Sequence, residues 1–199
     1  VVISAVTADV IAHYFEGDQR TFLTPEYSLN SPWELLLYTL MGFIAALASV
    51  GFSRMLYFSE DIWNLIRIPE PTKPILGGVL LGLLGIASYQ IDGFPRVFGV
   101  GYETIESTLF SQLTLQVTLG LLILKLIATT LTLGSGGSGG IFAPSLFMGA
   151  MLGAYFGQIA HTLFPEIVAP SGAYALVGMA AFFSGAAHAP MTAILILYE

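Results

Sequence analysis

Residues 131–153 read LTLGSGGSGGIFAPSLFMGAMLG, in which seven glycine and serine residues, Gly134 to Gly140, separate two long apolar segments. Pro144 follows closely after this run. Proline is favoured in the first turn of a helix, because its missing N–H is not needed there. The stretch therefore predicts one apolar helix that ends at the glycines and a second that starts directly after them.

The start of this second helix has a distinctive electrostatic character. An uncapped helix start carries unsatisfied N–H groups and about half a positive charge. No acidic residue lies between Leu126 and Pro165 to neutralise it, and inside a bilayer an unsatisfied start is costly unless an anion meets it. We therefore expect an anion site made of the main-chain amides of Gly140, Ile141 and Phe142. Loop-shaping positions, where glycine permits close approach and positive φ, are Gly134, Gly136, Gly137 and Gly139, together with Pro144.

The composition places this loop in a membrane protein. The 199 residues are 55% hydrophobic and only 10% charged, with a mean hydropathy of +0.81, whereas a soluble domain is about 25% charged. The net charge of −7, from 13 acids and 6 bases, argues against a nucleic-acid binder or a polybasic membrane-surface protein. The absence of cysteine excludes disulfide scaffolds and thiolate metal sites. Both ends fall in apolar sequence, so we expect an internal piece of a longer protein.

The apolar segments are unequal in length. A helix needs roughly 20 apolar residues to cross the hydrocarbon, and several segments are shorter. Short and broken helices are tolerated where protein or a wet cavity covers their ends, as in transporters and channels. The sequence predicts an all-α, polytopic integral membrane protein, with 92–112 interfacial or re-entrant. The expected helices are 1–15, 33–66, 75–91, 113–133, 141–164, 172–187 and 190–199.

Two kinds of residue are expected to place these helices. Aromatic side chains near the ends of 33–66 are candidate interface anchors: Trp33, Tyr38, Tyr57 and Trp63. Glycines spaced for close helix packing are Gly77, Gly78, Gly82 and Gly85 in one segment and Gly149, Gly153 and Gly157 in another.

Two other interpretations of the glycine loop compete with the anion site. Gly134, Gly136 and Gly139 satisfy GxGxxG, but a dinucleotide loop needs a preceding strand and an acid about 20 residues on, and neither is present. The loop is otherwise a flexible hinge between two membrane helices. The uncapped helix start is the feature that favours an anion site over a hinge.

A few other polar residues are candidates for a role. Lys125 lies inside an apolar segment, where it either pairs with an acid or a carbonyl or raises the positive potential near an ion pathway. Ser135 and Ser138 either donate hydroxyls to an ion or shape the loop. The histidines, at 13, 161 and 188, have no ligand-like spacing, so no metal site is expected. No nucleophile–base pair is present, and we expect no enzyme.

The run GSGGSGGIFAPSLFMGAMLGAYFG resembles the GxFxP signature of the CLC family of chloride channels and chloride/proton exchangers. The flanks LKLIATTLTLGSG and GAYALVGMAAFFSGAAHAPMTAILILYE are similar to that family's neighbouring helices, so the resemblance is strongest over about 117–199. It implies that the amides of Ile141 and Phe142 help to bind a central chloride, with Gly140 and Pro144 shaping the turn.

The resemblance also implies an architecture. Residues 1–199 would be one fragment of a membrane domain, with 1–16 as the last helix of its first half and 33–199 as most of its second, inverted half. A homodimer is expected, through the helices near 1–15 and 190–199. We expect a multi-pass protein in the plasma membrane, or in the inner membrane of a bacterium.

The expected function is transmembrane chloride transport, without a cofactor, by a voltage-gated-type channel or a chloride/proton antiporter. The gating and proton-transfer glutamates of the family have no counterpart in this stretch, so the choice between channel and antiporter stays open. The runner-up is a cation-coupled secondary transporter, in which the same amides bind a small carboxylate. A non-transporting membrane scaffold is the third hypothesis.

Overall fold

The computed structural model describes residues 2–17, 22, 24, 25, 27 and 31–198, so Val1 and Glu199, which belong to the predicted dimer helices, lie outside it. All regular structure in these residues is helical, as predicted. The helices are α1 (Val2–Glu16), α2 (Glu34–Leu65), the short 3-10 helix η1 (Glu70–Thr72), α3 (Lys73–Asp92), α4 (Tyr102–Leu109), α5 (Leu115–Gly134), α6 (Phe142–Leu163), α7 (Ser171–Ala187) and α8 (Pro190–Tyr198).

Prolines and glycines determine where the long helices begin and end. Helix α2 runs unbroken through its charged end, as the sequence predicts. The prolines that follow prevent a longer helix there, and only the short helix η1 forms before α3. Pro74 lies in the first turn of α3, where its missing N–H is not needed. Gly93, with φ 74°, closes α3 by donating its N–H to the Tyr89 carbonyl at 2.8 Å.

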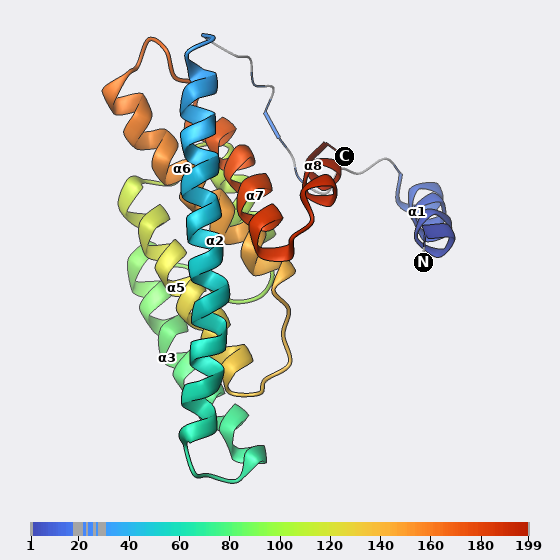
Figure 1. Cartoon of the computed structure of the whole chain (residues 1–199), viewed down its shortest axis with the longest axis vertical. Coiled ribbons are helices and arrows are strands. Elements are labelled where there is room, and N and C mark those ends of the chain that lie inside the picture. The colour runs from blue at the N-terminus through green and yellow to red at the C-terminus, as the bar shows by residue number, and fades with distance from the viewer. Residues whose placement is uncertain (1, 18–21, 23, 26, 28–30, 199) are drawn as a thin grey trace.

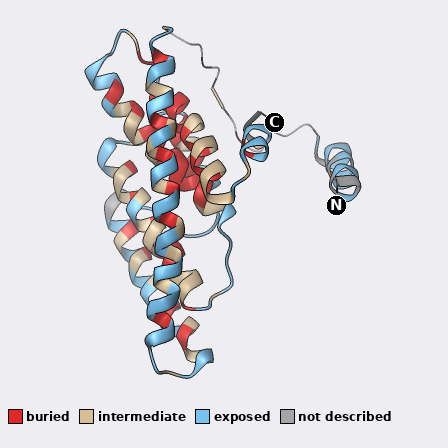
Figure 2. Ribbon diagram, in the orientation of Figure 1, coloured by how far each residue is buried: buried red, intermediate tan, exposed pale blue. Residues whose placement is uncertain are grey.

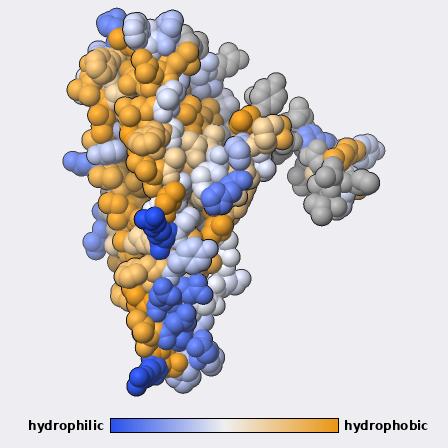
Figure 3. Space-filling view, viewed as in Figure 1, coloured by the Kyte–Doolittle hydropathy of each residue, from blue (hydrophilic) through white to orange (hydrophobic). Residues whose placement is uncertain are grey.

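Among the residues that the structure describes, three stretches of helix are long and apolar enough to cross a membrane: 34–65, 70–90 and 115–134. They lie side by side in Figure 1 as α2, α3 and α5. Apolar atoms cover most of this face in Figure 3, and hydrophilic atoms gather at its lower end, where α2 turns into η1. This distribution is that of a protein whose outer surface faces lipid rather than water.

Helix α6 forms the centre of the core. One group of its buried residues, including Phe147 and Met151, packs with α4, α5 and α7. Met148, on another face, joins a cluster with Met41 and Phe52 of α2. The red of buried residues in Figure 2 accordingly lies behind α2, along α6 and α7. The helix that begins after the glycine loop is therefore held by protein on several sides.

The predicted glycine ridge joins α6 to α7. A methyl group added at Gly149 or Gly178 would collide with the backbone carbonyl of the other residue. One added at Gly153 would collide with the Tyr174 carbonyl and lie 2.9 Å from the Ala175 Cα. Glycine is needed at these positions because the two backbones touch, as in small-residue packing between membrane helices.

The other predicted glycine ridge is only half correct. An added Cβ at Gly77 would collide with Ser135, and one at Gly85 with the Phe98 ring, so both positions are in close contact. Gly78 and Gly82 face open space and pack against nothing in the described residues. The glycine spacing correctly predicted a helix, but it did not predict which glycines are packed, because only one face of α3 touches the rest of the described chain.

The expectation of four aromatic interface anchors holds for two. Trp33 and Tyr57 are exposed by 68% and 70%, as anchors would be. Trp63 is wrong as an anchor, because it is only 6% exposed and packs beside Gly134. Tyr38 is also an internal residue: its hydroxyl donates to Glu34 Oε1 at 3.0 Å and its ring lies 4.6 Å from that of Tyr174.

Two parts of the chain stand apart from this bundle. Helix α1 lies away from it in Figure 1, and the described side chains of α1 are all exposed. Helix α8 exposes Met191, Ile194 and Leu195, while Ala193 is buried against the core. The mixed segment 92–112 contains the end of α3, an irregular stretch 93–101 and the short helix α4, which packs on α6 and α7.

Candidate functional site

Three backbone hydrogen bonds connect the first residues of the glycine loop to the last turn of α5. The N–H groups of Ser135, Gly136 and Gly137 donate to the carbonyls of Leu131, Leu133 and Thr132, at 3.0, 3.0 and 2.9 Å. Gly136 has φ 81°, in the left-handed region that favours glycine. The chain then runs without further regular structure until α6 begins at Phe142.

The glycines of this loop have different roles. Positive φ, expected for the group, occurs only at Gly136. Gly134 and Gly137 are needed for close packing instead, since an added Cβ would lie 3.0 Å from Trp63 Cδ1 and 2.8 Å from the Thr132 carbonyl oxygen respectively. At Gly139 it would lie 3.2 Å from Leu133. At Gly140 it would meet nothing within 4 Å.

The start of α6 is uncapped, as predicted. Ile141 is the N-cap residue and makes no side-chain cap hydrogen bond, while its carbonyl accepts the Ser145 N–H at 3.0 Å. Among the described residues, no acceptor meets the N–H groups of Gly140, Ile141 or Phe142. Gly140, Ile141 and Phe142 are exposed, and the first N–H groups of a helix have no partner within the helix, so these donors are open to a ligand.

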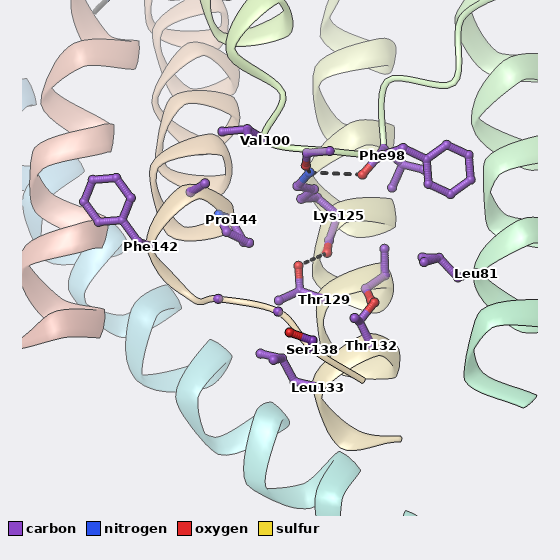
Figure 4. Close-up of a pocket in the computed structure, with 16 residues that line it drawn as sticks. Leu81, Phe98, Val100, Lys125, Thr129, Thr132, Leu133, Ser138, Phe142 and Pro144 are labelled. Carbon is purple, nitrogen blue, oxygen red and sulfur yellow. Dashed lines mark hydrogen bonds between the residues drawn. The ribbon is translucent and has the colours of Figure 1, made fainter. Parts of the chain in front are cut away.

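A cavity of about 490 Å³ lies beside this helix start, and we call it the inner cavity. Gly139, Gly140, Phe142, Ala143 and Pro144 line one side of it. On the other sides are α5 and residues 97–100, the stretch between α3 and α4 (Figure 4). Free N–H donors and a cavity large enough for a hydrated small ion therefore lie together.

The polar lining of the inner cavity is neutral or positive. Lys125, Thr129, Thr132 and Ser138 contribute its polar side chains, and no acid is found among the described lining residues. Thr129 and Thr132 each donate their hydroxyl hydrogen to a carbonyl of α5, at 2.8 Å. The cation of Lys125 and the positive end of α6 thus act on the same space, which favours a negatively charged occupant.

Lys125 pairs with carbonyls, one of the two alternatives that the sequence left open. Its Nζ donates to the Val97 and Gly99 carbonyls at 3.0 and 2.7 Å, as the dashed lines in Figure 4 indicate. It also lies 4.9 Å from the centre of the Phe147 ring. The side chain is only 3% exposed. Its charge is therefore held by dipoles and a ring face, and remains unneutralised.

Several predicted site residues do not line the inner cavity. Gly134, Gly136, Gly137 and Ile141 are not among its lining residues. The ring of Phe142 turns away from Lys125 in Figure 4 and packs on Phe183 of α7, 5.1 Å between ring centres. Phe142 therefore borders the cavity through the start of α6 rather than by presenting its ring toward Lys125.

The two loop serines are distinguished by their contacts. Ser135 is buried and donates to the Thr132 carbonyl at 3.1 Å, a loop-shaping contact. Ser138 lines the inner cavity, so it remains a candidate donor to an ion. The dinucleotide interpretation is wrong in its structural requirement, because the loop joins α5 to α6 and no strand precedes it.

Sequence reasoning missed the stretch 97–100 and Glu34. The stretch had only a weak signal, the glycines of FGVGYETI, which suit an irregular backbone. Glu34 is fully buried, and its Oε1 accepts the Ala169 N–H at 2.7 Å as well as the Tyr38 hydroxyl. An acid that opens a long apolar helix was the available signal. Glu34 thus hydrogen-bonds the start of α2 to the segment before α7.

Comparisons with known proteins identify the family to which the chain is related. The voltage-gated chloride channel family matches residues 1–199. The chain is 33% identical over all its length to a ClcB-like chloride channel protein of Ralstonia nicotianae and to chloride channel protein CLC-e of Arabidopsis thaliana, of which it covers 45% and 30%. It is 28% identical to the H(+)/Cl(-) exchange transporter ClcA of Vibrio campbellii, of which it covers 42%.

The chain therefore spans less than half the length of these relatives. The family match, by contrast, covers every residue of it. The described residues form an all-helical bundle with apolar outer helices, which is compatible with a domain that spans a membrane. The chain belongs to the voltage-gated chloride channel (CLC) family.

Proposed function

We propose that the protein containing this chain carries chloride across a membrane, and that the amides of Gly140, Ile141 and Phe142 bind the ion on its way. One observation carries the proposal: three N–H groups without acceptors lie at the start of α6, beside a cavity that also contains a buried cation. Partial charges suit permeation, because a small anion is attracted by them and is still released.

The relatives support chloride over a carboxylate as the transported ion. Their names speak of chloride channels and of H(+)/Cl(-) exchange, so the cation-coupled carboxylate transporter is not favoured. Transport rather than catalysis is the proposed activity. A channel and a chloride/proton antiporter are the two forms of this transport that the relatives' names suggest.

We also propose the architecture that the family resemblance implies. Residues 1–16 are the last helix of the first half of the membrane domain, and 33–199 form most of the second half. The protein is multi-pass and homodimeric. The exposed apolar side chains of α1 and α8 support this assignment, because an isolated apolar surface in a membrane protein is available for lipid or for another helix.

Chloride efflux from liposomes tests the proposal. The full-length protein is reconstituted in vesicles loaded with potassium chloride, valinomycin is added to remove the opposing voltage, and a chloride electrode records release. Release well above that of protein-free vesicles is expected. Uptake of a small organic acid without chloride release would instead support the carboxylate transporter, and movement of neither would support the scaffold.

A pH electrode in the same assay distinguishes channel from antiporter. An antiporter moves protons against the chloride flow, so the external pH changes in step with chloride release, whereas a channel leaves it unchanged. Gly140 is the residue whose substitution connects this activity to the proposed amides, and its variant is described in the Discussion.

A further inference from the structure

A second cavity lies against the inner cavity and shares one wall with it. This outer cavity, of about 550 Å³, is lined by residues 94–96 and 98–104 and by Ser107 of α4. Phe98, Gly99 and Val100 line both cavities. We call residues 97–100 the partition: three of them line both cavities, and Val97 lines the inner cavity alone.

The partition has little hydrogen bonding of its own. Phe98 donates its N–H to the Pro95 carbonyl at 3.3 Å, and no acceptor for the N–H of Gly99 or Val100 is found among the described residues. Gly99 has φ 62°, so the backbone turns there. The Phe98 ring packs into the space left by the missing side chain of Gly85. Backbone hydrogen bonds alone thus do not determine the position of residues 97–100.

Lys125 provides the missing attachment. Its ammonium group has three donors, and two of them reach the Val97 and Gly99 carbonyls, on either side of Phe98. The bonds come from α5, a regular helix whose position the core determines. Bonds to a charged donor are about twice as strong as neutral ones. A single side chain therefore holds the partition at two points.

We propose that Lys125 is a positioning residue that keeps residues 97–100 closed between the two cavities and so limits the size of anion that passes. The inference rests on the proposed function and assigns a selectivity element to it. Without Lys125 the two carbonyls lose their donor, the partition moves, and the cavities join. Anions larger than chloride then gain a wider path.

Three variants of the full-length protein test the role. Lys125→Met removes both bonds, and Lys125→Arg keeps the charge and the donors. Lys73→Met is the matched control, because Lys73 is also buried but bonds to Glu70 at 2.8 Å and borders neither cavity. The readout in liposomes is the ratio of thiocyanate flux to chloride flux, which a change in the amount of folded protein does not alter.

Lys125→Met is expected to raise this ratio at least threefold, Lys125→Arg to return it to within twofold of wild type, and Lys73→Met to leave it unchanged. An unaltered ratio in Lys125→Met, or an equal increase in Lys73→Met, would overturn the proposal.

Hydrogen–deuterium exchange of the amides of residues 98–100 separates this inference from the proposed function, because it needs no transport. Faster exchange in Lys125→Met and wild-type exchange in Lys125→Arg and Lys73→Met are expected. If wild type releases no chloride, the proposed function fails while the exchange data still decide whether Lys125 holds the partition. Wild-type exchange in Lys125→Met would refute that role.

Discussion

At Gly140 the protein leaves space that a side chain would fill. This residue borders the inner cavity, an added Cβ would meet nothing within 4 Å, and its φ is not positive. Alanine is therefore compatible with the fold. The added methyl group would nevertheless stand beside the free N–H groups at the start of α6.

Gly140→Ala is expected to lower chloride release about tenfold, which corresponds to ~1.4 kcal/mol of lost stabilisation of the ion in transit. The folded amount should be unchanged. Gly82→Ala is the control, because Gly82 also faces open space but lies on α3, away from the inner cavity. Efflux from liposomes at equal protein content measures both, and equal rates in the two variants would contradict the assignment of Gly140.

Tyr27 lies outside the helices and is hydrogen-bonded to the core residue Leu109. Its hydroxyl donates to the Leu109 carbonyl, and burial raises its pKa to about 12. The folded state therefore keeps the proton more tightly than the unfolded state, whose tyrosine pKa is about 10. The resulting stability is complete below pH 10 and is lost as the pH rises toward 12.

Tyr27→Phe should lower the free energy of unfolding by about 1 kcal/mol at neutral pH. Between pH 10 and 12 the difference from wild type should shrink, since the wild-type phenol then loses its advantage. Thermal unfolding of the detergent-solubilised protein across this range checks the prediction. A difference that grows with pH would mean that the hydroxyl is not the group responsible.

At the scale of elements, the contact between α6 and α7 is the part that most restricts the sequence. Gly149, Gly153 and Gly178 place the two backbones in contact, and no side chain fits between them. The opposite holds on α3, where Gly78 and Gly82 touch nothing. Glycines of identical spacing therefore differ in what a substitution does.

Gly153→Ala should destabilise the protein by about 1–3 kcal/mol, as overpacking does. Gly78→Ala should be neutral or stabilising by up to about 1 kcal/mol, because alanine restricts the unfolded chain. Melting temperatures of the two variants in the same detergent give the comparison. Equal losses in both would show that α3 is packed on that face in the complete protein.

The sequence predicted the helices well because apolar segments are punctuated by strong local signals. Pro144 marks the start of α6 within one turn, and the segment predicted at 75–91 is α3, Lys73–Asp92. Neighbours that come from distant parts of the chain were not predictable in this way. Trp63 looked like an interface anchor, yet it packs on Gly134, a contact that no local pattern encodes.

The site also contains features that local sequence predicts and features that depend on distant residues. The uncapped start of α6 followed from composition and one proline, because capping is a local property. The partition at 97–100 did not, since its position depends on Lys125, 26 to 28 residues away along the chain. The sequence predicted that the loop glycines permit close approach and positive φ, but it did not show that Gly134 and Gly137 serve only close approach.

For the whole molecule, the surface outside the bundle is the main unexplained feature. Helices α1 and α8 expose large apolar side chains, among them Val10, Tyr14 and Ile194. The relatives are more than twice as long as this chain. The proposed architecture assigns some of these surfaces to other helices of the same protein, and the proposed dimer assigns others to a second copy.

Cysteine cross-linking tests the dimer. The chain contains no cysteine, so Ile194→Cys is introduced into a cysteine-free full-length protein and oxidised in the membrane. Most of the protein should migrate as a covalent dimer. Ile86→Cys, exposed on α3, serves as the control and should stay monomeric. Similar dimer yields at both positions would argue against an interface at α8.

The mutual contact of Gly149 and Gly178 has a consequence for ion binding. Because two main chains lie against each other without intervening side chains, α6 has almost no freedom to shift sideways. Under the proposed function, the dipole of α6 would therefore be oriented before an ion arrives, and a sideways shift of this helix would not be part of ion binding.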